Sequence, residues 1–247
     1  VKWITIGELI LEHCLSPVIP IVCNVRGDLL RDREYKVTTT DKARIITRLL
    51  ETHRPRKILV FVNTAINGDA LCYELNQMIS RGELRMSRDR IITYFGKNTA
   101  ANEAKLSAFI DADLREEPII CISCRKLCCG FDDINIDAVI FADQRSSIED
   151  INQCCGRSYR YKPGKMAAYV VVLYDSLNKM RGNGMIATFI KYLRNEKIIG
   201  EHYICEVSRP GFNYIIKPPD NRRMEDIPEL LSADDEEEYF TPDEDID

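Results

Sequence analysis

Short runs of apolar residues, separated by polar segments, recur along the middle of this chain. The clearest are Lys57–Asn63, which reads KILVFVN, and Ala167–Leu173, which reads AAYVVVL. A continuous apolar run of this length is typical of a strand that is buried on both faces of a parallel sheet. The pattern predicts five such strands, at residues 57–63, 90–95, 118–123, 136–142 and 167–173.

Segments with helical spacing of apolar residues lie between these strands. In Thr64–Ser80, for example, Leu71, Leu75 and Met78 recur every three or four residues, and Asp41 is a candidate cap for the helix Lys42–Thr52. Strands that alternate with helices predict an α/β fold with a mainly parallel sheet. Helices are predicted at residues 6–14, 42–52, 64–80, 100–111, 147–155 and 185–196, an extended stretch at 16–23, and a last strand within 203–217.

Two arginines follow the predicted helix Ser147–Cys155. Arg157 and Arg160 belong to the pattern Gln-x-x-Gly-Arg-x-x-Arg, which begins at Gln153. Residues three apart on a helix share a face, so a continued helix would present both guanidinium groups to one target at a rim of the sheet. Gly156 allows a ligand or a backbone to approach closely. Two permanently charged guanidinium groups, each with a forked set of N–H donors, suit a polyphosphate and the charge that develops when it is cleaved.

The stretch from Ile119 to Arg160 resembles motifs V and VI of superfamily 2 helicases. Within that superfamily it is more similar to the DEAD/DEAH-type branch, which includes restriction-enzyme motors and large-DNA-virus helicases. The strand–turn–helix at residues 57–80 resembles motif IV. The residues that carry the resemblance are Ser123, Arg125-Lys126-Leu127, Gly130-Phe131-Asp132, Ile136-Asp137, Ser146-Ser147, Asp150-Ile151, Gln153, Gly156-Arg157, Arg160 and Pro163-Gly164-Lys165.

This resemblance implies a RecA-like three-layer sandwich, the second of two motor lobes that hold ATP and Mg²⁺ between them. It implies that Arg157 and Arg160 stabilise the transferring phosphoryl group, with Gln153 beside them, and that Gly130, Asp132 and Gly156 lie near the nucleotide. DNA or RNA would cross loops at the strand ends, gripped by its phosphates. The candidate contacts are Asn63, Thr64, Gly96, Lys97, Ser123 and Arg125.

A phosphate-binding loop of the form G-x-x-x-x-G-K-[ST] does not occur in this sequence. Gly96-Lys97 and Gly164-Lys165 lack both the earlier glycine and the following Ser or Thr, and no Asp-Glu pair ends an apolar strand. By the resemblance, both features belong to a first RecA-like lobe. We therefore expect this chain to be the second lobe of a longer protein, as the missing initiator Met also suggests, and to be inactive as an ATPase alone.

Charge divides the chain. Residues 224–247 hold twelve of the 39 acidic residues and no Lys or Arg, which leaves 27 acidic against 34 basic residues in the rest, a net charge of +7. A basic body suits phosphate-rich partners, although an ordinary solvated surface explains it equally well. We expect an interlobe linker at residues 1–40, the RecA-like lobe at 41–217 and an acidic tail at 218–247 that does not fold alone.

Ten cysteines raise the question of a metal site. Cys121 lies in a predicted strand and Cys124 just after it, and residues three apart along a strand point to opposite faces. Adjacent Cys154 and Cys155 diverge on a helix. Reduced thiols are therefore favoured over a zinc site, which indicates a cytoplasmic or nuclear protein. The style of the motifs suggests a viral source. No apolar run is long enough to span a bilayer, and no secretion signal is present.

Three functions remain open on the sequence. The first is the second motor lobe of an ATP-dependent helicase or translocase, which is enzymatic only within the full protein. The second is a non-catalytic RecA-like module that binds nucleic acid or a protein. The third is a metal-dependent binding domain, which stoichiometric zinc analysis would test.

Overall fold

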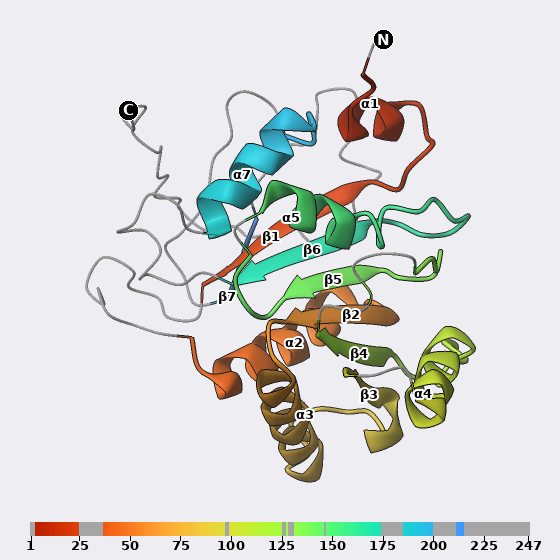
Figure 1. The fold of residues 1–247 in the computed structure, drawn as a ribbon, viewed down its shortest axis with the longest axis vertical. Coiled ribbons are helices and arrows are strands. Elements are labelled where there is room, and N and C mark those ends of the chain that lie inside the picture. The colour runs from red at the N-terminus through yellow and green to blue at the C-terminus, as the bar shows by residue number, and fades with distance from the viewer. Residues whose placement is uncertain are drawn as a thin grey trace.

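A single twisted sheet with helices on both faces forms the body of the protein in a computed structural model (Figure 1). The structure describes residues 3–24, 37–96, 99–124, 127, 131–145, 147–173, 185–199 and 211–214. Of the predicted elements and residues, the acidic tail and Lys97, Arg125 and Gly130 lie outside these ranges. The domain boundaries predicted at residues 40 and 217 therefore stay predictions.

Seven strands and six α-helices carry the described part of the chain. The strands are β1 (Val18–Asn24), β2 (Lys57–Val62), β3 (Ile91–Tyr94), β4 (Ile119–Cys124), β5 (Ala138–Phe141), β6 (Ala168–Leu173) and β7 (Gly211–Tyr214). The helices are α1 (Ile6–Leu11), α2 (Thr39–His53), α3 (Ala65–Ser80), α4 (Ala100–Ile110), α5 (Ile148–Cys155) and α7 (Met185–Asn195), and a short 3₁₀ helix, η1 (Arg88–Arg90), precedes β3.

The strand order is β3-β4-β2-β5-β6-β1-β7. The first six strands are parallel to their neighbours, and β7 alone pairs antiparallel, with β1. Each of the five predicted strands is present, and the extended stretch at 16–23 is β1. Because β2 and β5 are adjacent, with Phe61 paired to Phe141, the loops after these two strands meet at the same edge of the sheet.

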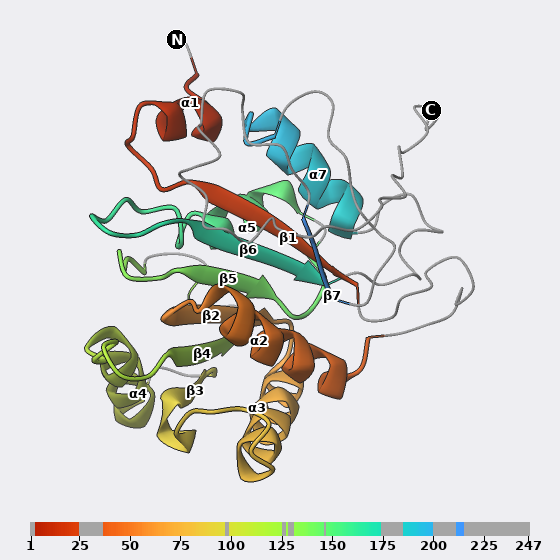
Figure 2. The ribbon, with the colours of Figure 1, turned by 180° about the vertical axis from the view of Figure 1, so that it is seen from behind.

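Two hydrophobic cores, one on each face of the sheet, confirm the predicted three-layer α/β architecture. Alternate residues of β2 divide between them: Leu59 and Phe61 face α4, α5 and α7, whereas Ile58, Val60 and Val62 face α2 and α3. Figure 1 shows α5 and α7 in front of the sheet. Figure 2, the view from the opposite side, shows α2 in front of the sheet. Since both faces are covered, every residue of β2 is buried.

Helix starts follow local capping chemistry, with one correction to the prediction. Thr38, not Asp41, caps α2: its hydroxyl accepts from the N–H of Asp41, whose carboxylate accepts from the N–H of Thr38 at 2.9 Å. This reciprocal capping box starts the helix at Thr39, earlier than predicted. The hydroxyls of Thr64, Thr99 and Ser147 cap α3, α4 and α5 by accepting from the N–H three residues further on, without the reciprocal bond.

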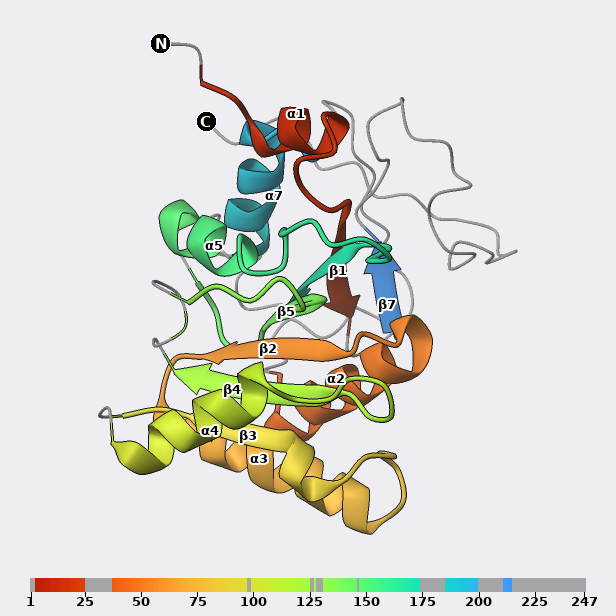
Figure 3. The ribbon, with the colours of Figure 1, turned by 90° about the vertical axis from the view of Figure 1, so that its right-hand side faces the viewer.

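The first helix, α1, packs against the end of α7 although nearly the whole chain separates them (Figure 3). The N–H of Gly7 donates to the carbonyl of Glu196 at 2.7 Å. A Cβ on Gly7 would lie 2.2 Å from the carbonyl oxygen of Lys197, so only glycine permits this approach. The helix ends at Leu11, earlier than predicted.

Candidate functional site

The arginine pair follows α5 instead of continuing it. Ile151, Cys154 and Cys155 are buried on one face of the sheet, whereas Gln153 is exposed. The helix ends at Cys155, and the N–H of Gly156 donates to the carbonyls of Asn152 and Cys154. Residues 156–160, here named the arginine turn, are therefore not helical. The expectation that Arg157 and Arg160 share a helical face was wrong, because the helix stops before reaching them.

Both arginines nevertheless reach the same short segment of motif V. Arg157 Nη1 donates to the carbonyl oxygen of Phe131, and Arg160 Nε lies 3.1 Å from Asp132 Oδ1. The Arg160 and Asp132 side chains are 49% and 61% exposed. Phe131 and Arg157 are 26 residues apart in the sequence, and the tertiary fold brings them together. The two arginines therefore do converge, but through a turn and not through helical spacing.

The arginine turn lies at the edge of the sheet where the strands begin. Arg160 forms a backbone bridge with Leu15, just before β1, and its carbonyl accepts from the hydroxyl of Ser16 at 2.8 Å. Phe131 packs beside Phe109, at the end of α4, with ring centroids 6.3 Å apart. The pair therefore occupies the amino-terminal rim of the sheet, at the opposite end of the strands from the loops that follow β2 and β3.

A buried ion pair anchors the segment that the arginines contact. Lys57 Nζ, at the start of β2, lies 2.6 Å from Asp133 Oδ2, and neither side chain is more than 5% exposed. The same ammonium donates to the carbonyl of Ile110 at 2.8 Å and lies over the Phe109 ring. Asp133 Oδ1 also accepts from the N–H of Asn135 at 2.9 Å. The Asp133 carboxylate is therefore held by Lys57 and by Asn135, while the side chain of neighbouring Asp132 is at the surface.

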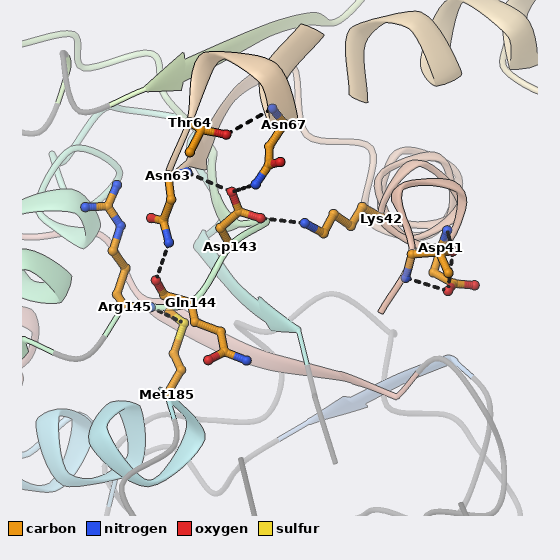
Figure 4. A network of polar contacts seen from close by, with 10 residues as sticks. Asp41, Lys42, Asn63, Thr64, Asn67, Asp143, Gln144, Arg145 and Met185 are labelled. Atoms are coloured by element: carbon orange, nitrogen blue, oxygen red, sulfur yellow. Dashed lines mark hydrogen bonds and ion pairs between the residues drawn. The ribbon is translucent and has the colours of Figure 1, made fainter. Parts of the chain in front are cut away.

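The carboxyl-terminal rim is organised around Asp143, which lies two residues after the end of β5 (Figure 4). Its carboxylate accepts from the N–H of Asn63 at 2.7 Å, from the side-chain amide of Asn67 at 2.9 Å and from the ammonium of Lys42 at 2.5 Å. Burial alone would raise the pKa of Asp143, but these three donors hold it below its usual value. One carboxylate therefore joins the starts of α2 and α3 to the ends of β2 and β5.

The predicted nucleic-acid residues divide between exposed and buried positions. Asn63 donates its amide to the carbonyl of Gln144 at 3.0 Å, and the Thr64 hydroxyl accepts from the N–H of Asn67 at 3.1 Å. Gly96 has a φ of 76°, and no atom lies within 4 Å of where its Cβ would be, so its backbone is open to close approach. Ser123 is fully buried, and its hydroxyl accepts from the N–H of Leu127.

Sequence reasoning missed the roles of three residues that shape these two rims. Asp143 follows an apolar strand, a position where a polar residue commonly faces a ligand site, so the pattern could have indicated it. Nothing local marks Lys42, whose partner Asp143 is 101 residues away. Lys165 carried only the resemblance of Pro163-Gly164-Lys165, and nothing local indicated that its ammonium would reach Ile136. Among the described residues, no group of three or more His, Cys, Asp or Glu is placed to hold a metal ion. In the same ranges, no helix is long and apolar enough to cross a membrane.

Comparison with known proteins agrees with this fold. Residues 41–162 match the family model described as "Helicase conserved C-terminal domain". Residues 41–162 therefore have the RecA-like α/β fold of a helicase conserved C-terminal domain. No curated protein sequence matches the chain significantly.

Several solved structures share the fold at low sequence identity. A fragment of a putative HsdR subunit of a type I restriction enzyme from Vibrio vulnificus YJ016 has 18% identity and a TM-score of 0.54, over 72% of this chain and 35% of that one. The type ISP restriction-modification enzyme LlaBIII, bound to DNA, has 18% identity and a TM-score of 0.56, over 77% and 14%. A variant of S. cerevisiae Dbp5, bound to RNA and ADP BeF3, has 13% identity and a TM-score of 0.51, over 73% and 39%.

The chain therefore spans well under half the length of each of these proteins. At such identities the likeness shows the fold alone. None of the three supports the expectation of a viral source.

Proposed function

We propose that this chain is the second motor lobe of an ATP-dependent nucleic-acid helicase or translocase. Its role would be to supply Arg157 and Arg160 to an ATP molecule that a first RecA-like lobe holds. The observation that carries the proposal is the convergence of both guanidinium groups on the Phe131–Asp132 segment. Motifs V and VI thereby form one surface, as a nucleotide site between two lobes requires.

The exposure of the Arg160–Asp132 pair fits such a role. Because both side chains are about half exposed, their attraction is screened by water and worth at most about 1 kcal/mol. Arg160 can therefore leave Asp132 for a phosphate at little cost when the lobes close. Arg157, held by a backbone carbonyl, is already oriented. A guanidinium beside a transferring phosphoryl group is worth roughly 10³–10⁵ in rate.

ATP and Mg²⁺ would be held mainly by the first lobe. The paired guanidinium groups suit the phosphates of ATP, whereas the described residues offer no cluster of carboxylates for the metal. The chemistry supplied on this side is charge stabilisation, with Gln153 and Gly156 next to the arginines and Asp132 and Gly130 in motif V. Turnover by the isolated chain is expected to be negligible, because nothing in its sequence forms a phosphate-binding loop.

DNA or RNA would lie along the carboxyl-terminal rim. Asn63, Thr64 and Gly96 lie at the ends of β2 and β3, where N–H groups at helix starts and an unshielded glycine can approach phosphates. Lys97, Arg125 and the backbone beside buried Ser123 complete the candidate set. Because the nucleotide and nucleic-acid surfaces lie at opposite ends of the strands, closure of the lobes on ATP would change the grip through rigid-body movement of this lobe.

The test is the nucleic-acid-stimulated ATPase of the full-length protein. Arg157→Ala and Arg160→Ala should each lower kcat by on the order of 10³-fold while nucleotide binding stays largely intact. Arg48→Ala, which removes a largely exposed arginine on α2, is the matched control and should behave as wild type. Full turnover in either turn variant would refute the assignment. A wild-type protein that binds nucleic acid without hydrolysing ATP would instead be the non-catalytic binding module.

A further inference from the structure

Lys165 directs its ammonium inward, onto three backbone carbonyls. Nζ donates to the carbonyl oxygen of Ile136 at 2.6 Å, to that of Ser158 at 2.5 Å and to that of Arg160 at 3.2 Å. An ammonium group has three N–H donors, and all three are used here. Among the described residues no carboxylate forms an ion pair with Lys165, so surface salt bridging does not explain its position.

The three carbonyls belong to the two halves of the candidate nucleotide site. Ser158 and Arg160 lie in the arginine turn, between and at the two guanidinium-bearing residues. Ile136 lies on the segment that leads from Phe131 and Asp132 into β5. One ammonium therefore joins the backbone that carries the arginines to the backbone that they contact.

Other hydrogen bonds hold the arginine turn to α5 and to the segment before β1. The N–H groups of Arg157 and Ser158 donate to the carbonyls of Cys154 and Cys155, and the Tyr159 carbonyl accepts from the N–H of Ser16. These bonds do not reach the Phe131–Asp132 segment, which the turn contacts through the two arginine side chains. Lysine reaches all three carbonyls because its charge sits at the end of a long apolar stem that can be buried. Charge-assisted bonds from this half-buried ammonium are stronger than neutral ones and favour a single arrangement.

We propose that Lys165 is a positioning residue that sets the arginine turn against the Phe131–Asp132 segment, so that Arg157 and Arg160 arrive at the nucleotide together. This inference rests on the proposed function for its catalytic consequence. In this role Lys165 acts through the arginines, because its three N–H donors are used on backbone carbonyls.

The catalytic test uses the full-length protein with Lys165→Met, Lys165→Arg and Lys162→Met. Lys165→Met keeps the apolar stem and removes the donors. It should lower kcat on the order of 10²-fold, the usual effect of a slightly misplaced catalytic group, with little change in KM for ATP. Lys165→Arg keeps a charged donor and should restore most of the lost rate. Lys162→Met is the matched control: its ammonium donates to the Asn135 side chain at 2.6 Å and to no other described residue, and its rate should equal wild type.

A structural test on the chain itself separates this inference from the proposed function. In ¹⁵N spectra, the guanidinium N–H of Arg157 that donates to the Phe131 carbonyl should be protected from exchange in wild type and in Lys162→Met, and should lose that protection in Lys165→Met. Thermal unfolding and circular dichroism check that each variant is folded, and Lys165→Arg provides a second folded variant.

The outcomes are distinct. Wild-type kcat and wild-type protection of the Arg157 guanidinium in Lys165→Met, with collapse of turnover in Arg157→Ala, would overturn the positioning role and leave the proposed function standing. Wild-type turnover in Arg157→Ala would overturn the proposed function. The exchange measurement would then decide alone whether Lys165 positions the turn.

Discussion

Replacing Lys57 with Met should destabilise this protein more than any change to a surface ion pair. The substitution removes the only charge beside the Asp133 carboxylate within 4 Å among the described residues and leaves that carboxylate 5% exposed. Removing one partner of a buried pair typically costs 3–5 kcal/mol, because the remaining charge is uncompensated. The hydrogen bond to Ile110 is lost as well, whereas Asn135 still donates to Asp133. We therefore expect a loss of about 3–4 kcal/mol in the free energy of unfolding.

Urea unfolding of the chain, followed by circular dichroism, measures this loss. Fluorescence is a poor probe, since the single Trp, Trp3, is 87% exposed. Arg115→Met is the matched control: its pair with Asp113 is equally short, at 2.7 Å, but the side chains are 88% and 50% exposed. This variant should lose less than about 1 kcal/mol.

A double variant separates charge burial from packing. Lys57→Met combined with Asp133→Asn leaves no buried charge and keeps an acceptor for Asn135. It should recover about 1 kcal/mol or more relative to Lys57→Met alone. The reasoning fails if Lys57→Met costs no more than Arg115→Met, or if the two substitutions in the pair are simply additive.

Two further predictions concern pH and close packing. Burial lowers the pKa of His53 from 6.5 to about 4, so the unfolded chain takes up this proton first. The free energy of unfolding should therefore fall between about pH 6.5 and pH 4, by no more than about 3 kcal/mol, and His53→Phe should reduce that slope in urea titrations at pH 4.5 and pH 7. Gly7→Ala places a Cβ against the Lys197 carbonyl and should cost about 1–3 kcal/mol; an unchanged urea midpoint would contradict the close contact of α1 with α7.

Much of the architecture could be predicted because burial leaves a local record. A strand covered on both faces has no polar positions, so KILVFVN indicated β2 and a parallel sheet directly. A helix covered on one face keeps a period near 3.6, which identified α3 and α7. Capping is also local, within four residues, and the error at Asp41 arose because two residues of one capping box can each be taken as the cap.

The candidate site depended on contacts that no local period records. The pattern at Gln153–Arg160 marked the arginines, yet helical spacing gave the wrong reason for their convergence: α5 ends at Cys155, and a turn directs both side chains to motif V. Lys57 was visible only as the first residue of a strand, with no sign of its pairing to Asp133, 76 positions away.

The sequence by itself determined the class of fold, the order of its elements and which residues carry charge suited to phosphate. Only the tertiary structure decided that Asp143 gathers Lys42, Asn63 and Asn67 at one rim and that Lys165 joins two backbone segments at the other. The physical reason is that side-chain periodicity reports whether a residue is buried, whereas the partner of a buried polar group is set by how strands are ordered in the sheet.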